Sequence, residues 1–215
     1  MSHPISYFRS FFEILVKPGE TFKTLVAEDP GYGKWVVVPI YSALGGINPT
    51  FYLLFLKVFP SWAALLAETL LMTAVGIFFF WIAALLNFLV GKWLGGKGTL
   101  GEVATAYAWA YVPCFAALFL IRLSEIPKWT AILGGETDLR VILETGRLLV
   151  FLALLPSMPF FIWSMVLMVF GISEAHRISR ARALGVMGIL LGLGLLVGGV
   201  TGVVVVFMIL RNVGH

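Results

Sequence analysis

The sequence has few charged residues and almost no cysteine. Of its 215 residues, 12% are charged and 60% are hydrophobic, and Cys114 is the single cysteine. Soluble domains carry about 25% charged residues, so one small aqueous core cannot account for this composition. Much of the chain must therefore face lipid. A lone cysteine in an apolar run also excludes an internal disulfide framework and a Cys/His metal site.

Residues that could carry catalysis are equally scarce. The chain has three histidines, two of them near its ends, and none is placed with a serine, cysteine or acid at a spacing that would build a buried triad. No HExxH motif occurs, and the glycine-rich stretch 91–101 lacks the GxxxxGK[ST] pattern of a phosphate-binding loop. We expect no enzymatic activity, no cofactor and no metal.

The N-terminal segment, residues 1–34, lacks an uninterrupted apolar stretch. Arg9, Glu13 and Lys17 break each candidate core of a cleavable signal peptide, so we expect none. Residues 4–17 place their large apolar side chains on one helical face and their charges on the other. This pattern favours a helix lying in the membrane interface. The alternative is a helix packed on the rest of the protein.

Long apolar runs dominate the remainder, residues 35–210. Five of these runs approach or exceed the ~30 Å of a hydrocarbon core when helical. The sequence thus predicts an all-α polytopic membrane protein with five transmembrane helices preceded by an amphipathic interfacial helix. The expected spans are residues 35–56, 62–91, 102–121, 148–172 and 185–210.

Basic residues predict the orientation of these spans. Lysine and arginine are more numerous in the segments on the N-terminal side of the membrane than in those on the other side. The positive-inside rule then places the N-terminus in the cytoplasm and the C-terminus outside, for a multi-pass protein of the cell (inner) membrane. Given a net charge of +4, the expected partner of the basic groups is the anionic bilayer surface rather than nucleic acid.

Three polar residues within the expected spans form a candidate intramembrane site: Asn48, Glu68 and Asn87. Pro49 removes a backbone donor and should kink or break the first span. Broken helices and intramembrane acids occur at transporter binding sites. The alternatives are a plain kink, and a Glu68 that lies at the membrane interface at little energetic cost.

A polar, basic island at residues 171–184 separates the last two apolar runs. It is a candidate docking site for an anionic lipid headgroup or an acidic partner protein. The alternative is an anchor that only fixes the orientation of the flanking spans. The candidate docking residues are Glu174, His176, Arg177, Arg180 and Arg182.

The last expected span is rich in glycine. Several of these glycines share an arc of about 100° on a helix, which is a smooth surface for close packing against another helix or a second copy of the chain. The residues of this glycine face are Gly185, Gly188, Gly192, Gly199 and Gly202.

Short motifs in order along the chain resemble the Yip family of integral membrane proteins. The matching positions are Pro18, Thr21 and Phe22, then 98–102 with 106–108 and Pro113, then 163–171 with Glu174, His176 and 182–183. The resemblance implies five spans with a cytosolic N-terminus. Eukaryotic members interact with Rab-type GTPases and carry a larger soluble region before their spans. Here the expected segment before the first span is residues 1–34, and the chain therefore resembles a compact prokaryotic type.

Two functions remain open at this stage. The first is a non-enzymatic membrane-organising or partner-docking scaffold, supported by the interfacial helix, the basic island and the glycine face. The second is a small transporter or channel for an unknown solute, supported by the break near Pro49 and by Glu68.

Overall fold

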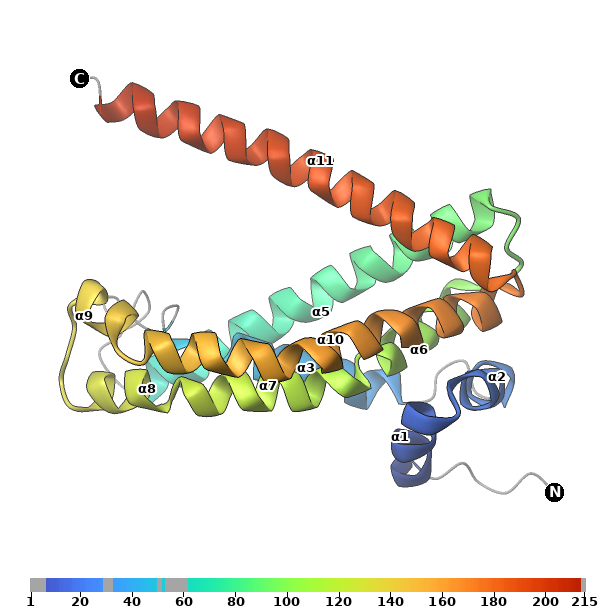
Figure 1. Cartoon of the computed structure of the whole chain (residues 1–215), viewed down its shortest axis with the longest axis horizontal. Coiled ribbons are helices and arrows are strands. Elements are labelled where there is room, and N and C mark those ends of the chain that lie inside the picture. Colours follow the sequence, from blue (N-terminus) through green and yellow to red (C-terminus); the bar gives the residue numbers. More distant parts are fainter. Residues whose placement is uncertain (1–6, 29–32, 50–51, 53–61, 214–215) are drawn as a thin grey trace.

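The computed structural model describes residues 7–28, 33–49, 52 and 62–213, and this part of the chain is helical with no strand. The all-α expectation is confirmed. Most of the long helices gather in one bundle, the last long helix slants away from it, and two short helices lie at each end (Figure 1). The helices are α1 (Tyr7–Val16), α2 (Pro18–Glu28), α3 (Lys34–Gly46), α5 (Trp62–Trp93), α6 (Leu100–Ala110), α7 (Val112–Ser124), α8 (Ile126–Leu133), α9 (Leu139–Glu144), α10 (Arg147–His176) and α11 (Arg180–Val213).

Three of the described helices are long and apolar enough to cross a membrane by themselves: α5, α10 and α11. The pair α6 and α7 makes a fourth candidate, bent by 41°. These elements coincide with the expected spans 62–91, 148–172, 185–210 and 102–121. The chain is therefore a membrane-embedded protein with three to four candidate spans.

The expected first span, residues 35–56, is not a continuous helix. Helix α3 ends at Gly46, and Ile47 has extended backbone angles. Two successive glycines weaken the helix here, and Pro49 disfavours helical geometry at the residue before it. Residues 50–51 and 53–56 lie outside the described part, so the count of five spans is not confirmed.

The bend between α6 and α7 occurs at Tyr111, two residues before Pro113. Proline cannot donate a backbone hydrogen bond, so carbonyl groups near the bend need other donors. Helix α10 supplies one, because Ser164 Oγ donates to the Ala110 carbonyl at 2.6 Å. The bend between α6 and α7 is thus fastened to α10 by a buried hydrogen bond.

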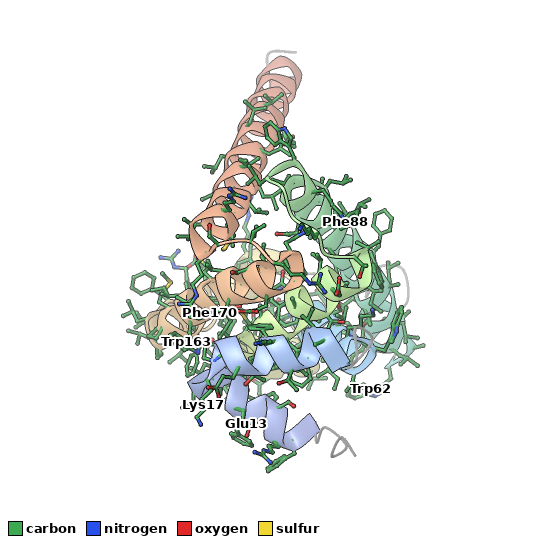
Figure 2. The ribbon with its side chains drawn as sticks, turned by 90° about the vertical axis from the view of Figure 1, so that its right-hand side faces the viewer. Glu13, Lys17, Trp62, Phe88, Trp163 and Phe170 are labelled. Atoms are coloured by element: carbon green, nitrogen blue, oxygen red, sulfur yellow. The ribbon has the colours of Figure 1, made fainter. Side chains whose placement is uncertain are left out.

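Helix α2 closes one end of the bundle. It packs against α6 and α10, and its Phe22 and Leu25 are buried with Trp109 and Leu167. Phe170 of α10 also lies beside the start of α2, within 3.7 Å of the Cβ position of Gly19 (Figure 2). This end of the bundle is therefore a closed apolar core.

Helix α1 has two different faces. Ser10 and Ile14 are buried, whereas Phe8 and Val16 are 75% and 78% exposed. A helix that packs one side on the protein and presents phenylalanine and valine on the other is typical of an interfacial helix. The expected segment 1–34 contains α1 and α2, and its residues 1–6 and 29–32 lie outside the described part.

Helix α11 diverges from the bundle (Figure 1). Its first turns are buried, with Ala183 and Val186 packed near Ile172 and Ile178. Further along, large side chains such as Leu195 are mostly exposed, here by 69%. The described part of α11 therefore has an apolar surface that no other described helix covers.

We expect Ser164→Ala to destabilise the protein by about 1 kcal/mol, because the Ala110 carbonyl loses a buried donor at the bend. Denaturant titration of the purified protein in mixed micelles measures this change. Thr201→Ala is the matched control, since Thr201 is exposed and its hydroxyl donates to the Val197 carbonyl within the same helix. Equal stability of the two variants would contradict the role given to Ser164.

Candidate functional site

The basic island lies in the connection between α10 and α11. Helix α10 ends at His176, and Arg177 adopts a left-handed backbone with φ 55°. Ser173 holds this turn, because its Oγ donates to the Ile178 carbonyl at 2.6 Å while its own carbonyl accepts from the Ile178 amide. A left-handed conformation costs a non-glycine residue about 1–2 kcal/mol. The surrounding contacts must therefore stabilise Arg177.

Arg177 is fastened to the start of α6. Its Nη2 donates to Glu102 Oε1 at 2.7 Å. The same carboxylate accepts from the Thr99 amide, and the Thr99 hydroxyl accepts from the Glu102 amide, which forms a capping box. The Glu102 carboxylate raises the pKa of Arg177 through this hydrogen bond. One acid thus caps α6 and holds the α10–α11 connection.

His176 is completely buried, against a cradle of glycines. A Cβ added at Gly91 or Gly96 would collide with the imidazole ring, and one at Gly98 would collide with the Ala175 carbonyl. Phe88 stacks on the ring at 6.2 Å. The glycine-rich connection 91–101 is therefore shaped around one side chain.

The imidazole nitrogens of His176 are buried without a hydrogen-bond partner in the described part of the chain. The Lys97 amide donates to the His176 carbonyl at 2.8 Å, so the backbone of this residue is fastened to the same connection. His176 belongs to the interior and cannot serve as a surface docking residue.

The remaining island residues stay near the surface. Arg180 lies over the Phe170 ring at 4.2 Å, and Arg182 Nη1 is 3.6 Å from the Cβ position of Gly95. Both arginines are exposed, and Glu174 is partly exposed. Of the five predicted docking residues, the three arginines are exposed, and Arg177 is the one that is paired with an acid.

Glu68 is buried within the bundle. Its exposed fraction is 0%, and neither carboxylate oxygen has a hydrogen-bond partner among the described residues. This differs from the interpretation of Glu68 as an interface residue that is solvated at little cost. A buried acid without a full set of hydrogen bonds is a candidate functional group in a membrane protein.

The end of α3 faces Glu68. The backbone of Asn48 lies on the side of the Glu68 carboxylate, and the positive charge of Arg122 also acts on it. Arg122 also donates to the Leu44 carbonyl at 2.9 Å and the Gly45 carbonyl at 3.1 Å. The Arg122 guanidinium therefore lies at the C-terminal end of α3, where the helix dipole is negative.

Arg122 is absent from the predicted polar site, because it comes directly after the expected span 102–121. The guanidinium is also paired with Glu125. The contact between Arg122 and the end of α3 joins segments 78 residues apart, so local sequence carries no signal for it.

The third residue of the predicted polar site lies elsewhere. Asn87 is buried and donates to the Ala83 carbonyl at 2.8 Å, within its own helix. It is also nineteen positions from Glu68 along α5, which corresponds to about 28 Å on a helix. The structure thus brings Asn48 and Glu68 together and leaves Asn87 near His176.

The predicted glycine face is largely uncovered. Gly185 approaches Leu94, whose Cδ1 lies 3.5 Å from the added Cβ, but nothing lies within 4 Å of that position at Gly188, Gly192 or Gly199. Gly202 is in α11, and its surroundings are outside the described residues. Beyond Gly185, the described residues do not use this face for helix packing.

The polar groups of these sites link helices to one another or are buried without a hydrogen-bond partner among the described residues. No group of three metal-ligating side chains occurs in the described residues. The polar clusters consist of ion pairs, helix caps and buried groups rather than a nucleophile beside a base. These features fit the holding of helices, the binding of a ligand or the movement of a small ion.

One family model matches most of the chain. Residues 12–201 match the model described as the Yip1 domain. No curated protein and no solved structure matches the chain.

We expect Gly91→Ala to destabilise the protein by about 1–3 kcal/mol, because the new methyl group overlaps the His176 ring. Helix propensity alone predicts the opposite, a gain of up to about 1 kcal/mol. Thermal unfolding in micelles distinguishes the two. Gly194→Ala, another helical glycine with nothing within 4 Å of its Cβ position, is the control and should follow propensity.

A double substitution tests the contact itself. If the ring is the obstacle, Gly91→Ala should destabilise a His176→Ala background much less than it destabilises the wild type. An unchanged penalty in that background would show that the cradle is not built around the imidazole.

Proposed function

The chain belongs to the Yip1 domain family, and from this premise we propose that it is a non-enzymatic scaffold that organises the membrane by assembling with copies of itself. Its exposed cytosolic elements dock anionic lipid and an acidic partner protein. The proposed setting is the cell (inner) membrane, with the N-terminus in the cytoplasm and the C-terminus outside.

The observation that carries this proposal is the separation of α11 from the bundle. Its glycines line a helix whose described apolar side chains are largely exposed. Lipid chains are as apolar as leucine, so exposure alone does not drive helices together in a membrane. A run of small residues does allow two backbones to approach closely. A second copy of α11 is therefore the occupant that suits this face.

The docking role rests on the other exposed elements. Helix α1 presents Phe8, Phe12 and Val16 outward, and Arg180 and Arg182 remain exposed at the α10–α11 connection. Apolar side chains and nearby cations together favour binding to an anionic bilayer surface. An acidic surface on a partner protein is also negatively charged, so it would attract Arg180 and Arg182 in the same way.

We expect Gly192→Leu to lower the fraction of assembled protein at least severalfold, because the larger side chain separates the two copies. Single-molecule photobleaching of labelled protein in liposomes, over a range of protein-to-lipid ratios, measures this fraction. Gly194→Leu is the matched control, since Gly194 is in the same helix, is equally unobstructed and lies off the glycine face. A monomeric wild type, or equal effects of both variants, would contradict assembly through this face.

A small transporter or channel is the second candidate, and the buried Glu68 beside the broken α3 favours it. Such a protein would use Glu68 to bind a proton or cation at the break. A scaffold requires no movement of ions across the membrane, so a measurement of proton flux distinguishes it from a transporter.

For a scaffold, we expect liposomes carrying the wild type to hold an imposed proton gradient as well as empty liposomes do. An enclosed pH-sensitive dye reports the gradient under a potassium diffusion potential. Glu68→Gln should behave identically. A proton flux in the wild type that disappears in Glu68→Gln would instead support the transporter.

A further inference from the structure

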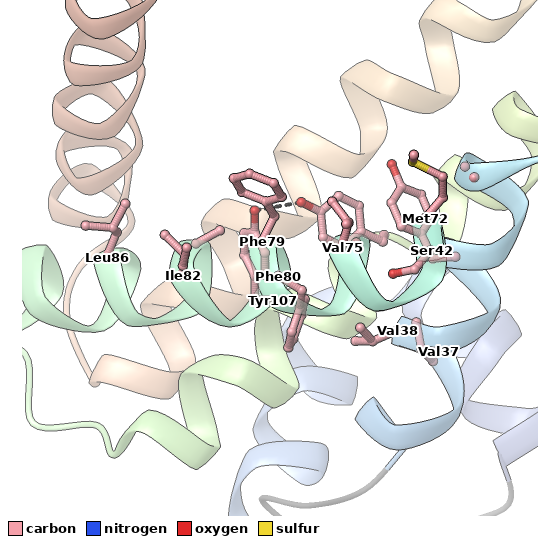
Figure 3. Close-up of a pocket in the computed structure, with 16 residues that line it drawn as sticks. Val37, Val38, Ser42, Met72, Val75, Phe79, Phe80, Ile82, Leu86 and Tyr107 are labelled. Atoms are coloured by element: carbon pink, nitrogen blue, oxygen red, sulfur yellow. Dashed lines mark hydrogen bonds between the residues drawn. The ribbon is translucent and has the colours of Figure 1, made fainter. Parts of the chain in front are cut away.

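A cavity of about 500 Å³ lies between α3, α5 and the bend of α6 and α7 (Figure 3). Along α5 it extends from Met72 to Leu86, in the middle turns of a helix that spans Trp62–Trp93. Its depth in the bilayer therefore corresponds to the hydrocarbon region. The volume is within the range of pockets that hold small molecules.

Two of the elements that line the cavity are irregular where they meet it. Gly45 and Gly46, which end α3, line one side, and Tyr111, at the α6–α7 bend, lines the other. At membrane depth, irregular backbone is tolerated where it is buried in protein or lines a cavity. Two such irregularities facing one cavity indicate a site rather than a packing defect.

The walls are apolar except for a few hydroxyl groups. Tyr111 donates its hydroxyl hydrogen to the Tyr107 hydroxyl at 2.6 Å. The Tyr107 hydrogen and the Ser42 hydroxyl have no acceptor among the described residues, although Ser42 is only 8% exposed. The cavity thus offers hydrogen-bond donors to a guest.

Aromatic rings shape the cavity beside those donors. Tyr41 stacks on Tyr111 with ring centroids 4.6 Å apart and an interplanar angle of 27°. Phe80 packs on Tyr107 at 5.5 Å. Flat aromatic walls favour a flat guest, because rings pack well in offset stacks.

The side of the cavity along α5 opens towards the surrounding lipid. Phe79 is 60% exposed, and Val75 and Ile82 are 38% and 37% exposed, although all three line the cavity. A guest with a long apolar tail could therefore place its head inside and leave its tail in the bilayer.

These features exclude the commoner occupants. The lining contains no charged side chain, so an ion would be poorly solvated. A phospholipid in its usual position keeps its ester carbonyls near the interface. The donors Ser42 and Tyr107 lie beside Gly76 and Phe80, at the middle turns of α5, and are therefore far from those carbonyls. The remaining chemistry is a flat apolar molecule that carries carbonyl acceptors and resides within the hydrocarbon.

We propose that this cavity binds a membrane quinone. The ring packs against the Tyr41–Tyr111 stack, and its carbonyl oxygens accept hydrogen bonds from the hydroxyls of Tyr107 and Ser42. The isoprenoid tail leaves past Phe79. This site is distinct from the assembly face on α11, so neither proposal depends on the other.

The test is photolabelling of the full chain in lipid nanodiscs with a short-tailed azidobenzoquinone. We expect the label to map to the α5 segment that lines the cavity, and to be displaced by an unlabelled short-tailed isoprenyl benzoquinone. An isoprenoid hydrocarbon of the same tail length, which has no carbonyl, should displace it about tenfold less well if the hydrogen bonds contribute.

Two sets of variants separate hydrogen bonding from volume. Tyr107→Phe together with Tyr111→Phe should weaken binding roughly three- to tenfold. Both tyrosines must change, because Tyr111 would otherwise donate in place of Tyr107. Gly45→Leu should also reduce binding by filling the cavity, since nothing lies within 4 Å of its Cβ position. Tyr52→Phe, away from the cavity, should bind normally.

Equal displacement by the quinone and the hydrocarbon would overturn the proposal, because it would show a site for apolar chains alone. Labelling that is indifferent to both the paired tyrosine variant and Gly45→Leu would also overturn it. Melting temperatures of each variant in nanodiscs, compared with the wild type, identify any loss of binding that follows from unfolding, and Ser42→Ala then provides an independent donor deletion.

Discussion

In hydrocarbon, every backbone amide and carbonyl needs a partner from the protein, and this requirement governs the helix bundle wherever a helix stops or bends. Arg122 donates to the carbonyls at the end of α3. The Ser164 hydroxyl donates to the carbonyl of Ala110 at the α6–α7 bend. The Ser173 hydroxyl donates to the carbonyl of Ile178 in the turn after α10. Each irregularity is thus matched by a side chain from the same or a neighbouring helix. The irregularities also define the sites, because each one brings polar atoms into an apolar interior.

The long apolar runs allowed good prediction of the continuous helices. Length and hydropathy located α5 and α10 to within a few residues at most ends, since no tertiary contact is needed to recognise an apolar stretch that is long enough to span. The segment from residue 35 to residue 56 was harder. The expected break near Pro49 was stronger than a kink, and the helix ends at Gly46. The local sequence predicts a weak point in α3. It does not predict the hydrogen bonds from Arg122 to the last carbonyls of α3, because Arg122 is in a distant part of the chain.

The candidate sites were less predictable than the fold. His176 was grouped with the island arginines because they are neighbours in sequence, yet it is buried in a cradle supplied by the 91–101 connection. The sequence shows that residues 91–101 are rich in glycine, but it does not show that these glycines make room for the His176 side chain. Glu68 shows the same limitation. Its carboxylate interacts with the Asn48 backbone and with the charge of Arg122, and neither interaction follows from the periodicity of α5.

The short connection after α10 has a mechanical consequence. Helix α11 contains 34 residues, which corresponds to about 51 Å, and its described side chains beyond the first turns are largely exposed. Its direction is set where Arg177 holds a left-handed backbone beside Glu102. A rotation of about 10° at this pivot would move the far end of such a helix by about 9 Å. The Arg177–Glu102 pair therefore lies at the pivot of a long helix, where a small change in one ion pair becomes a large lateral displacement of the far end.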